Sequence, residues 1–216
     1  GLGCYQPPDR LPDVVRPPVL RSGHITFGSL NNLSKINDRV VELWSLVLRA
    51  NPDSRLLVFY TGLKSLGTRL HMLERFARAG IGTDRVTLAW QKPLLQHWDV
   101  YNQVDIVLDA FPWNAHTTAC EGLWMGVPIV TLQGERHCAR LCASMLHQVG
   151  LPELVAETPG AFVGLASQLA ANPEKLREMR MTMRARIAAS ALSDAGGFAR
   201  SVENEYRRMW KAWCEV

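Results

Sequence analysis

Residues 114–128 combine hydrogen-bond donors, a carboxylate and turn-forming residues in an order that suits phosphate and sugar chemistry. His116, Thr117 and Thr118 stand at the start of a predicted helix, and Glu121 follows about one turn later. A helix start offers unpaired backbone N–H groups and the positive end of the helix dipole, which together can bind a diphosphate. Thr118 and Glu121 share a helix face, so the carboxylate would lie within reach of a ribose diol. The pattern indicates a nucleotide-sugar site.

A second candidate phosphate contact lies in residues 28–36, around the end of the first predicted strand. This loop lacks the G-x-G-x-x-G pattern, so NAD or FAD binding is not expected. It offers instead Asn31, Asn32 and Lys35, whose amides and ammonium group can bond and neutralise phosphate oxygens. Taken alone, the loop could equally be an Asn-rich turn with a surface lysine. Residues 61–65 resemble a phosphate loop only superficially, because the upstream glycine of that motif is absent.

Other polar and aromatic residues give weaker indications. His97 lies one turn into the helix predicted after the third strand, near enough to that strand's end to face a base or a ribose. A lone histidine is nevertheless more often a surface or core residue. Asp105 and Asp109, on the fourth predicted strand, are too weak a pair to indicate acid–base chemistry. Three tryptophans are interpreted by default as core or interface aromatics: Trp44, Trp113 and Trp124.

The elements that must position these residues alternate along the chain. Apolar runs predict strands at residues 25–30, 55–61, 85–90, 104–110 and 128–132. Amphipathic spacing predicts helices at residues 37–50, 66–79, 94–103, 117–125, 136–149, 159–171, 173–189 and 197–213. This alternation is typical of an α/β fold with a Rossmann-like parallel sheet, here followed by a helical tail. Because ligands of such sheets bind at the carboxyl ends of the strands, the loops after Leu30, Trp90, Ala110 and Leu132 are expected to line the site.

Two regions are predicted. Residues 1–23 contain Pro7, Pro8, Pro12, Pro17 and Pro18, which discourage helix and indicate a proline-rich linker. Residues 24–216 form the predicted nucleotide-sugar-binding, Rossmann-like domain. Because the chain begins inside a proline-rich segment, we expect it to be the downstream part of a longer protein.

Composition narrows the functional classes. Of the 216 residues, 47% are hydrophobic and 20% charged, which suits one soluble α/β domain with a full core. The formal charge of +4 is mildly basic, and the basic clusters at residues 175–186 and 207–211 are interpreted as solvated helix faces. Nucleic acid is not an expected partner, because no strand interleaves aromatic and basic residues. No apolar run approaches the ~20 residues that span a bilayer, so no membrane partner is expected.

The cysteines favour a reducing compartment. There are 5 of them, an odd number without paired spacing, and no signal peptide precedes them: Cys4, Cys120, Cys138, Cys142 and Cys214. We therefore predict a cytoplasmic protein. Cys138 and Cys142, with His137 and His147 nearby, could form a metal site, but helical cysteines at this spacing are more often small core residues. No metal and no other cofactor is expected.

Four separated motifs carry a family resemblance. Residues 27–36, 108–118, 124–128 and 206–211 resemble the carboxyl-terminal catalytic half of the protein O-GlcNAc transferase and SPINDLY family. The similarity runs in order from about residue 24 to the end and covers nearly the whole chain. It implies a GT-B glycosyltransferase, in which two Rossmann-like domains face each other across a cleft, with this chain as the donor-binding domain.

The resemblance also implies an activity and a set of residue roles. The family transfers a sugar from a nucleotide donor to Ser or Thr of proteins, inverting and without a metal, while an upstream Rossmann-like domain and tetratricopeptide repeats, not in this chain, complete the enzyme. By this resemblance Lys35 is catalytic and stabilises the leaving diphosphate, which Asn32 also binds. The remaining roles are phosphate contacts for His116, Thr117 and Thr118, a ribose contact for Glu121, and nucleoside contacts for His97 and the backbone of Lys92.

The identity of the donor is the open part of the resemblance. Asn32 and Glu121 are similar to the SPINDLY branch, whose plant members are O-fucosyltransferases that use GDP-fucose. His116 before two threonines is instead similar to the O-GlcNAc branch, and Leu94 replaces a lysine typical of animal O-GlcNAc enzymes. We expect UDP-GlcNAc as donor, with GDP-fucose as the alternative. A non-catalytic nucleotide-binding scaffold is the rival from another class.

Overall fold

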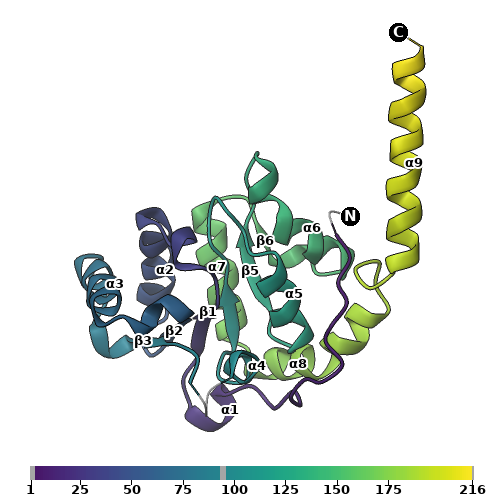
Figure 1. The fold of residues 1–216 in the computed structure, drawn as a ribbon. Helices are drawn as coiled ribbons and strands as arrows, with labels where there is room; N and C mark the ends of the chain where they lie inside the picture. The colour runs from purple at the N-terminus through teal and green to yellow at the C-terminus, as the bar shows by residue number, and fades with distance from the viewer. Residues whose placement is uncertain (1–2, 93–95, 216) are drawn as a thin grey trace.

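The computed structural model describes residues 3–92 and 96–215, and its centre is a parallel sheet of six strands (Figure 1). The strands lie in the order β3-β2-β1-β4-β5-β6. Their bounds are β1 Thr26–Ser29, β2 Arg55–Phe59, β3 Val86–Ala89, β4 Ile106–Leu108, β5 Ile129–Leu132 and β6 Val155–Ala156. The strand order reverses direction between β1 and β4, which is where an open α/β sheet leaves a crevice for a ligand. The predicted Rossmann-like fold is confirmed.

The helices cover both faces of this sheet. Their bounds are α1 Val19–Ser22, α2 Asp38–Ala50, α3 Leu66–Arg78, α4 His97–Tyr101, α5 Thr117–Trp124, α6 Leu141–Gln148, α7 Pro159–Ala170, α8 Pro173–Ala188 and α9 Ala195–Cys214. Helices α2, α3 and α7 form one layer, in which α2 contacts both of the others. Helices α5 and α6 contact β5 from the other side, and α8 runs against α5. This two-sided cover explains why the strands are nearly continuous apolar runs.

Strand β1 lies at the middle of the sheet and leads directly into the candidate site. Phe27 pairs with Leu56 of β2 on one side and with Ile106 of β4 on the other. Gly28 is required by close packing, because a Cβ there would clash with the methyl carbons of Val104. The short loop that follows β1 therefore begins from a strand that is paired on both sides and closely packed at Gly28.

The proline-rich segment before the sheet is largely extended and packs along the domain, ending in the single turn of α1. Asp105 fixes its end, since one carboxylate oxygen accepts a hydrogen bond from Val19 N at 3.0 Å and the other from Thr26 N at 2.8 Å. Nearer the N-terminus, the carbonyl of Pro12 accepts a hydrogen bond from Arg184 at 2.8 Å, and Tyr5 N donates to Leu192 O at 2.7 Å. These contacts tie residues 5–19 to the domain at several points.

Two predicted helices differ from the structure, and one short strand is additional to the prediction. The helix predicted at residues 136–149 is divided into a 3₁₀ turn, His137–Ala139, and α6, because the carbonyls of Cys138 and Ala139 accept hydrogen bonds from Asn114 N and Gly134 N instead of continuing the helical ladder. The helix predicted at residues 94–103 covers only His97–Tyr101 among the described residues. The two-residue strand β6 was not predicted, because so short a run has no measurable periodicity.

Helix α9 projects away from the rest of the molecule (Figure 1). None of its residues is buried, and Trp210 and Trp213 expose 67% and 76% of their surface. Within the described ranges, no helix is both long enough and apolar enough to cross a membrane.

Candidate nucleotide-sugar site

A cleft of about 410 Å³ opens at the carboxyl ends of β1, β2 and β3, beside the start of α5. Its walls come from the loops after these three strands and from α4 and α5. The residues that line it are Leu30, Asn31, Asn32, Lys35, Phe59, Tyr60, Thr61, Gln91, His97, His116, Thr117, Thr118 and Glu121. The cleft therefore lies at the edge of the sheet where the strand order predicts a ligand.

The loop after β1 places Asn32 and Lys35 at the cleft through a 3₁₀ turn, Leu33–Lys35. Asn32 begins this turn, and its side-chain oxygen accepts a hydrogen bond from Ser34 N at 3.0 Å. Lys35 is half-buried, and its Nζ donates to the carbonyl of Asn114 at 2.9 Å. Burial lowers the pKa of Lys35, and the nearby carboxylate of Asp109 opposes this shift. The lysine thus bridges the first loop and the loop before α5.

Asp109 organises the loop before α5 from beneath. It is buried, with one carboxylate oxygen accepting hydrogen bonds from Ala110 N and Ala115 N, both at 2.7 Å. The other oxygen accepts from Thr131 Oγ1 at 2.7 Å. Burial raises the pKa of Asp109 to about 6, although these hydrogen bonds and Lys35 act in the opposite direction. The carboxylate of Asp109 therefore has a structural role, because it holds the backbone of the loop before α5.

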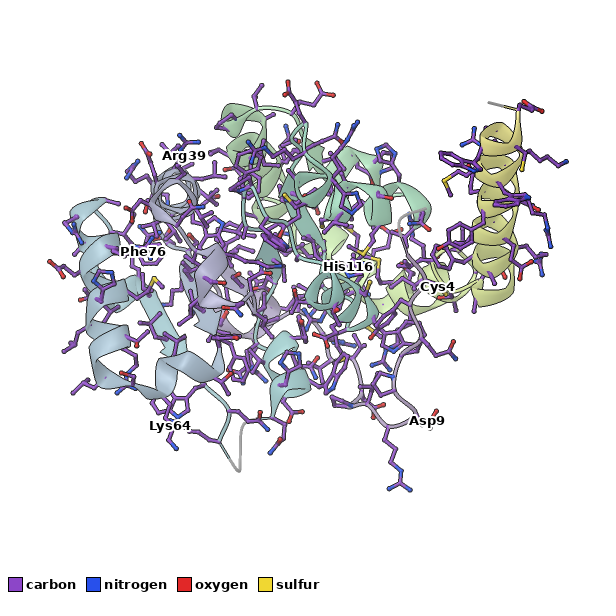
Figure 2. The ribbon with its side chains drawn as sticks, turned by 45° about the horizontal axis from the view of Figure 1, so that its top comes forward. Cys4, Asp9, Arg39, Lys64, Phe76 and His116 are labelled. Carbon is purple, nitrogen blue, oxygen red and sulfur yellow. The ribbon has the colours of Figure 1, made fainter. Side chains whose placement is uncertain are left out.

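The start of α5 is open toward the cleft. His116 precedes the helix and its side chain makes no capping hydrogen bond, so no partner is seen among the described residues for the backbone N–H groups of Thr117 and Thr118. Thr118 Oγ1 donates to the side-chain oxygen of Asn31 at 3.3 Å. Figure 2 shows His116 at this helix start, and a Cβ on Gly3 of the N-terminal segment would lie 3.4 Å from its Nε2. Donors for an anion therefore converge on the same side as Lys35.

A carboxylate with two donors closes the other side of the cleft. Glu121 Oε2 lies 2.8 Å from His97 Nε2, and Tyr101 OH donates to the same oxygen at 3.1 Å. Burial raises the pKa of Tyr101 well above its ordinary value, and the charge of Glu121 raises it further, so the phenol keeps its proton and acts as a donor. The imidazole of His97 also stands edge-on to Tyr101, with ring centroids 5.7 Å apart. These contacts hold the Glu121 side chain in one orientation.

Seven of the eight residues proposed from the sequence line this one cleft: Asn32, Lys35, His97, His116, Thr117, Thr118 and Glu121. Lys92 is not among the lining residues. Its ammonium lies 4.2 Å from the ring centroid of Trp90, and its carbonyl accepts a hydrogen bond from Gln96 at 3.4 Å. Leu94, the position used to compare branches of the family, lies outside the described residues. His97 is the first residue of α4, not one turn into a helix as predicted.

The cleft also contains residues that the sequence pattern did not indicate. Phe59 is the last residue of β2, and Tyr60 and Thr61 follow it. The rule that ligands bind at the carboxyl ends of strands also points to this strand end. The loop after Leu132 was expected at the site but lines separate hollows, with Gln133 and Arg140. Trp113, interpreted as a core or interface residue, is 59% exposed and lies 6.0 Å from Lys35 Nζ, measured to its ring centroid.

The candidate metal cysteines are separated by the break before α6. Cys138 lies in the 3₁₀ turn, and Cys142 is buried within α6. Burial raises the pKa of the Cys142 thiol well above its ordinary value, which disfavours the thiolate that binds metals. Residues 3–92 and 96–215 contain no group of three or more His, Cys, Asp or Glu side chains arranged to hold a metal ion.

Comparison with known proteins gives one family. Residues 18–202 match the model of glycosyl transferase family 41. The chain is 39% identical over 216 residues to the probable UDP-N-acetylglucosamine–peptide N-acetylglucosaminyltransferase SPINDLY of Oryza sativa subsp. japonica, a match that covers 98% of this chain and 23% of the rice protein. A Caenorhabditis elegans UDP-N-acetylglucosamine–peptide N-acetylglucosaminyltransferase is 29% identical over 192 residues, which cover 88% of this chain and 16% of the relative.

A solved structure agrees with the sequence matches. The O-GlcNAc transferase of Thermobaculum terrenum superposes with a TM-score of 0.86 at 33% identity, over 97% of this chain and 39% of that one. The present chain thus spans less than half of the solved relative and about a quarter of the rice relative. It belongs to glycosyl transferase family 41, and its fold is that of the carboxyl-terminal domain of a GT-B glycosyltransferase.

Proposed function

We propose that this chain is the donor-binding half of a protein O-glycosyltransferase that moves GlcNAc from UDP-GlcNAc to Ser or Thr of proteins, with inversion and without a metal ion. The observation that carries the proposal is the convergence of three groups on one cleft: the Lys35 ammonium, the open start of α5 and the His97–Glu121 pair. The first two groups can bind a diphosphate, and the third can bind the hydroxyls of a ribose. The rice and nematode relatives are named for transfer from UDP-N-acetylglucosamine to peptides.

In this proposal the donor lies across the cleft with its diphosphate between Lys35 and the N–H groups of Thr117 and Thr118. Its ribose hydroxyls bond to Glu121, while the base lies near His97 and the backbone of Lys92. Negative charge on the diphosphate grows as the sugar leaves, so a fixed cation and a fixed helix start favour the transition state over the bound donor. Preorganised donors of this kind are commonly worth about 3 kcal/mol or more.

The rest of the enzyme lies in parts that this chain does not contain. The acceptor site and any catalytic base belong, in this proposal, to an upstream Rossmann-like domain that forms the opposite wall of the cleft. Tetratricopeptide repeats would present the acceptor protein, and the enzyme would work in the cytoplasm. The comparison supports this view, because the rice relative is about four times as long as the matched region.

Binding measurements test the donor. We expect the chain to bind UDP more tightly than GDP in isothermal titration calorimetry, and UDP-GlcNAc more tightly than GDP-fucose. Preference for the guanine nucleotides would assign the domain to O-fucosyl transfer, the alternative that Asn32 and Glu121 favour. A chain that binds neither nucleotide at millimolar concentration would refute the proposal. A full-length enzyme that binds the donor and transfers nothing would support a scaffold instead.

A further inference from the structure

Tyr101 lies behind the proposed ribose contact and has no part in the function so far. The side chain comes from the end of α4 and is fully buried, so it does not line the cleft itself. Its ring packs against the backbone of α5, where a Cβ on Gly122 would lie 3.3 Å from Tyr101 Cε1. Only the hydroxyl reaches toward the polar edge of the site.

That hydroxyl contacts two groups on neighbouring turns of α5. It lies 3.1 Å from the carbonyl oxygen of Thr118 and 3.1 Å from Glu121 Oε2. A phenol has one hydrogen, so it can donate to only one of these acceptors at a time. In either case the hydroxyl lies between them, at the end of a ring that is fully buried against Gly122.

The carboxylate of Glu121 is therefore oriented from one side. Oε2 lies within hydrogen-bond distance of both His97 Nε2 and Tyr101 OH, whereas no hydrogen bond to Oε1 is seen among the described residues. A carboxylate held through one oxygen presents the other in a fixed direction. Because Glu121 lines the cleft, its carboxylate is within reach of a ligand there.

The backbone that carries Tyr101 is anchored just as firmly. Arg180 of α8 is buried and donates from Nη2 to the carbonyl of Tyr101 at 2.7 Å and from Nη1 to that of Val104 at 2.6 Å. A buried guanidinium bonded to two carbonyls is costly to displace, because its charge would lose its partners. The end of α4 is thus fixed to α8, and the phenol to α5.

We infer that Tyr101 is a positioning residue for ribose recognition, holding the Glu121 carboxylate so that its second oxygen accepts hydrogen bonds from the 2′- and 3′-hydroxyls of a nucleoside diphosphate. The inference rests on the proposed function, since it requires a ribonucleotide in this cleft. In this inference, Tyr101 helps the site to distinguish ribose from a sugar without these hydroxyls, although it does not line the cleft.

The test compares ribonucleotides with their 2′,3′-dideoxy analogues. Calorimetry on the whole chain would use UDP, GDP and the two dideoxynucleoside diphosphates. Tyr101→Phe should weaken binding of the preferred ribonucleotide roughly tenfold, as expected for loss of a hydrogen bond to a charged group. Its affinity for the dideoxy form should change by less than about twofold, because that ligand has no hydroxyl for Glu121 to hold.

Tyr5→Phe is the matched control, because it removes another buried tyrosine hydroxyl, one that has no hydrogen-bond partner among the described residues. It should leave both affinities near those of the wild type. In the Glu121→Ala background, Tyr101→Phe should have no further effect on ribonucleotide binding, because the group through which it acts is gone. Equal losses for both ligands, or an undiminished ribonucleotide affinity, would overturn the inference.

A measurement on the wild-type chain covers the case in which Tyr101→Phe does not fold. Proton NMR should show a slowly exchanging tyrosine hydroxyl signal that shifts on addition of the preferred ribonucleotide and much less with its dideoxy form. A signal that responds equally to both ligands, or to neither, would overturn the role of Tyr101. If the wild type binds no nucleotide at all, the proposed function fails, which is a separate result.

Discussion

Lys35 joins the two loops that the proposed diphosphate would occupy, and its exchange for methionine is the most direct test at the scale of a residue. Lys35→Met keeps the stem and removes the cation, so UDP affinity should fall about tenfold or more, because a charge-assisted contact contributes about 1.5–3 kcal/mol. Thr117→Val should cost less, since the backbone N–H groups of α5 remain. Calorimetry with and without EDTA measures both effects.

Lys64→Met is the control for this experiment. Lys64 is exposed and belongs to the segment after β2 that resembles a phosphate loop only superficially. Its removal should leave UDP affinity unchanged, which separates a specific contact from the general attraction of a basic surface. Binding that collapses with EDTA, or a Lys35→Met chain with wild-type affinity, would show that the electrophilic role belongs elsewhere.

The lowered pKa of Lys35 predicts a pH dependence. In the proposed function the ammonium form of Lys35 binds the diphosphate. Because burial lowers its pKa, Lys35 loses its proton at a lower pH than an ordinary lysine, whose pKa is about 10.4. As the pH rises, the UDP affinity of the wild type should therefore begin to fall at a lower pH than an ordinary lysine would cause, whereas Lys35→Arg keeps its charge and should lose less affinity. The ratio of the two affinities cancels any titration of the nucleotide itself. Parallel profiles for the two proteins would contradict the prediction.

At the scale of elements, Asp109 links β4 to the start of α5. Its pKa of about 6 lies above that of an unfolded aspartate near 4, so the folded state binds more protons between these values. Its contribution to stability is therefore greatest at low pH and declines as the pH rises through about 4 to 6. The substitution Asp109→Asn would keep an acceptor for Ala110 N and Ala115 N without this titration.

We therefore expect the difference in unfolding free energy between wild type and Asp109→Asn to change by about 2–3 kcal/mol from about pH 4 to pH 7, to the disadvantage of the wild type. Urea denaturation at several pH values measures it. The exposed Asp53 provides a control, since Asp53→Asn should follow the wild type across this range. A constant difference for Asp109→Asn would mean that the carboxyl does not titrate in the folded state between these values.

The elements also show what a sequence can reveal. Most strands and helices are predictable because apolar runs and amphipathic spacing are local signals, as for α2, where Asn37 also caps the helix by accepting a hydrogen bond from Val40 N at 3.0 Å. The break before α6 could not be predicted in this way, because it depends on a hydrogen bond from Asn114 N, in another loop, to the carbonyl of Cys138. Likewise, His97 could be proposed from its place after a strand, but its pairing with Glu121 requires the packing of α4 against α5.

At the scale of the whole molecule, the proposed function makes this chain one of two walls that enclose donor and acceptor. In that proposal the residues that line the described cleft bind the diphosphate and the ribose of the donor, and the acceptor hydroxyl is placed by the other wall. Helix α9 extends away from the domain, and its residues Tyr206, Trp210 and Trp213 are exposed. Binding and transfer should therefore separate when this chain is studied alone.

We predict that the isolated chain binds UDP but does not glycosylate proteins. Holding donor and acceptor together accounts for a large share of the barrier reduction in a two-substrate reaction, about 7–11 kcal/mol in well-oriented cases, and one wall of the cleft cannot provide it. Transfer of radiolabelled GlcNAc to an acceptor protein should stay at background under conditions where calorimetry shows the chain saturated with UDP-GlcNAc. In the full-length enzyme transfer should appear, and Lys35→Met should lower turnover more than it weakens donor binding, because the charge on the leaving diphosphate grows toward the transition state. Efficient transfer by these 216 residues alone would mean that the acceptor site and the catalytic base both lie on this domain.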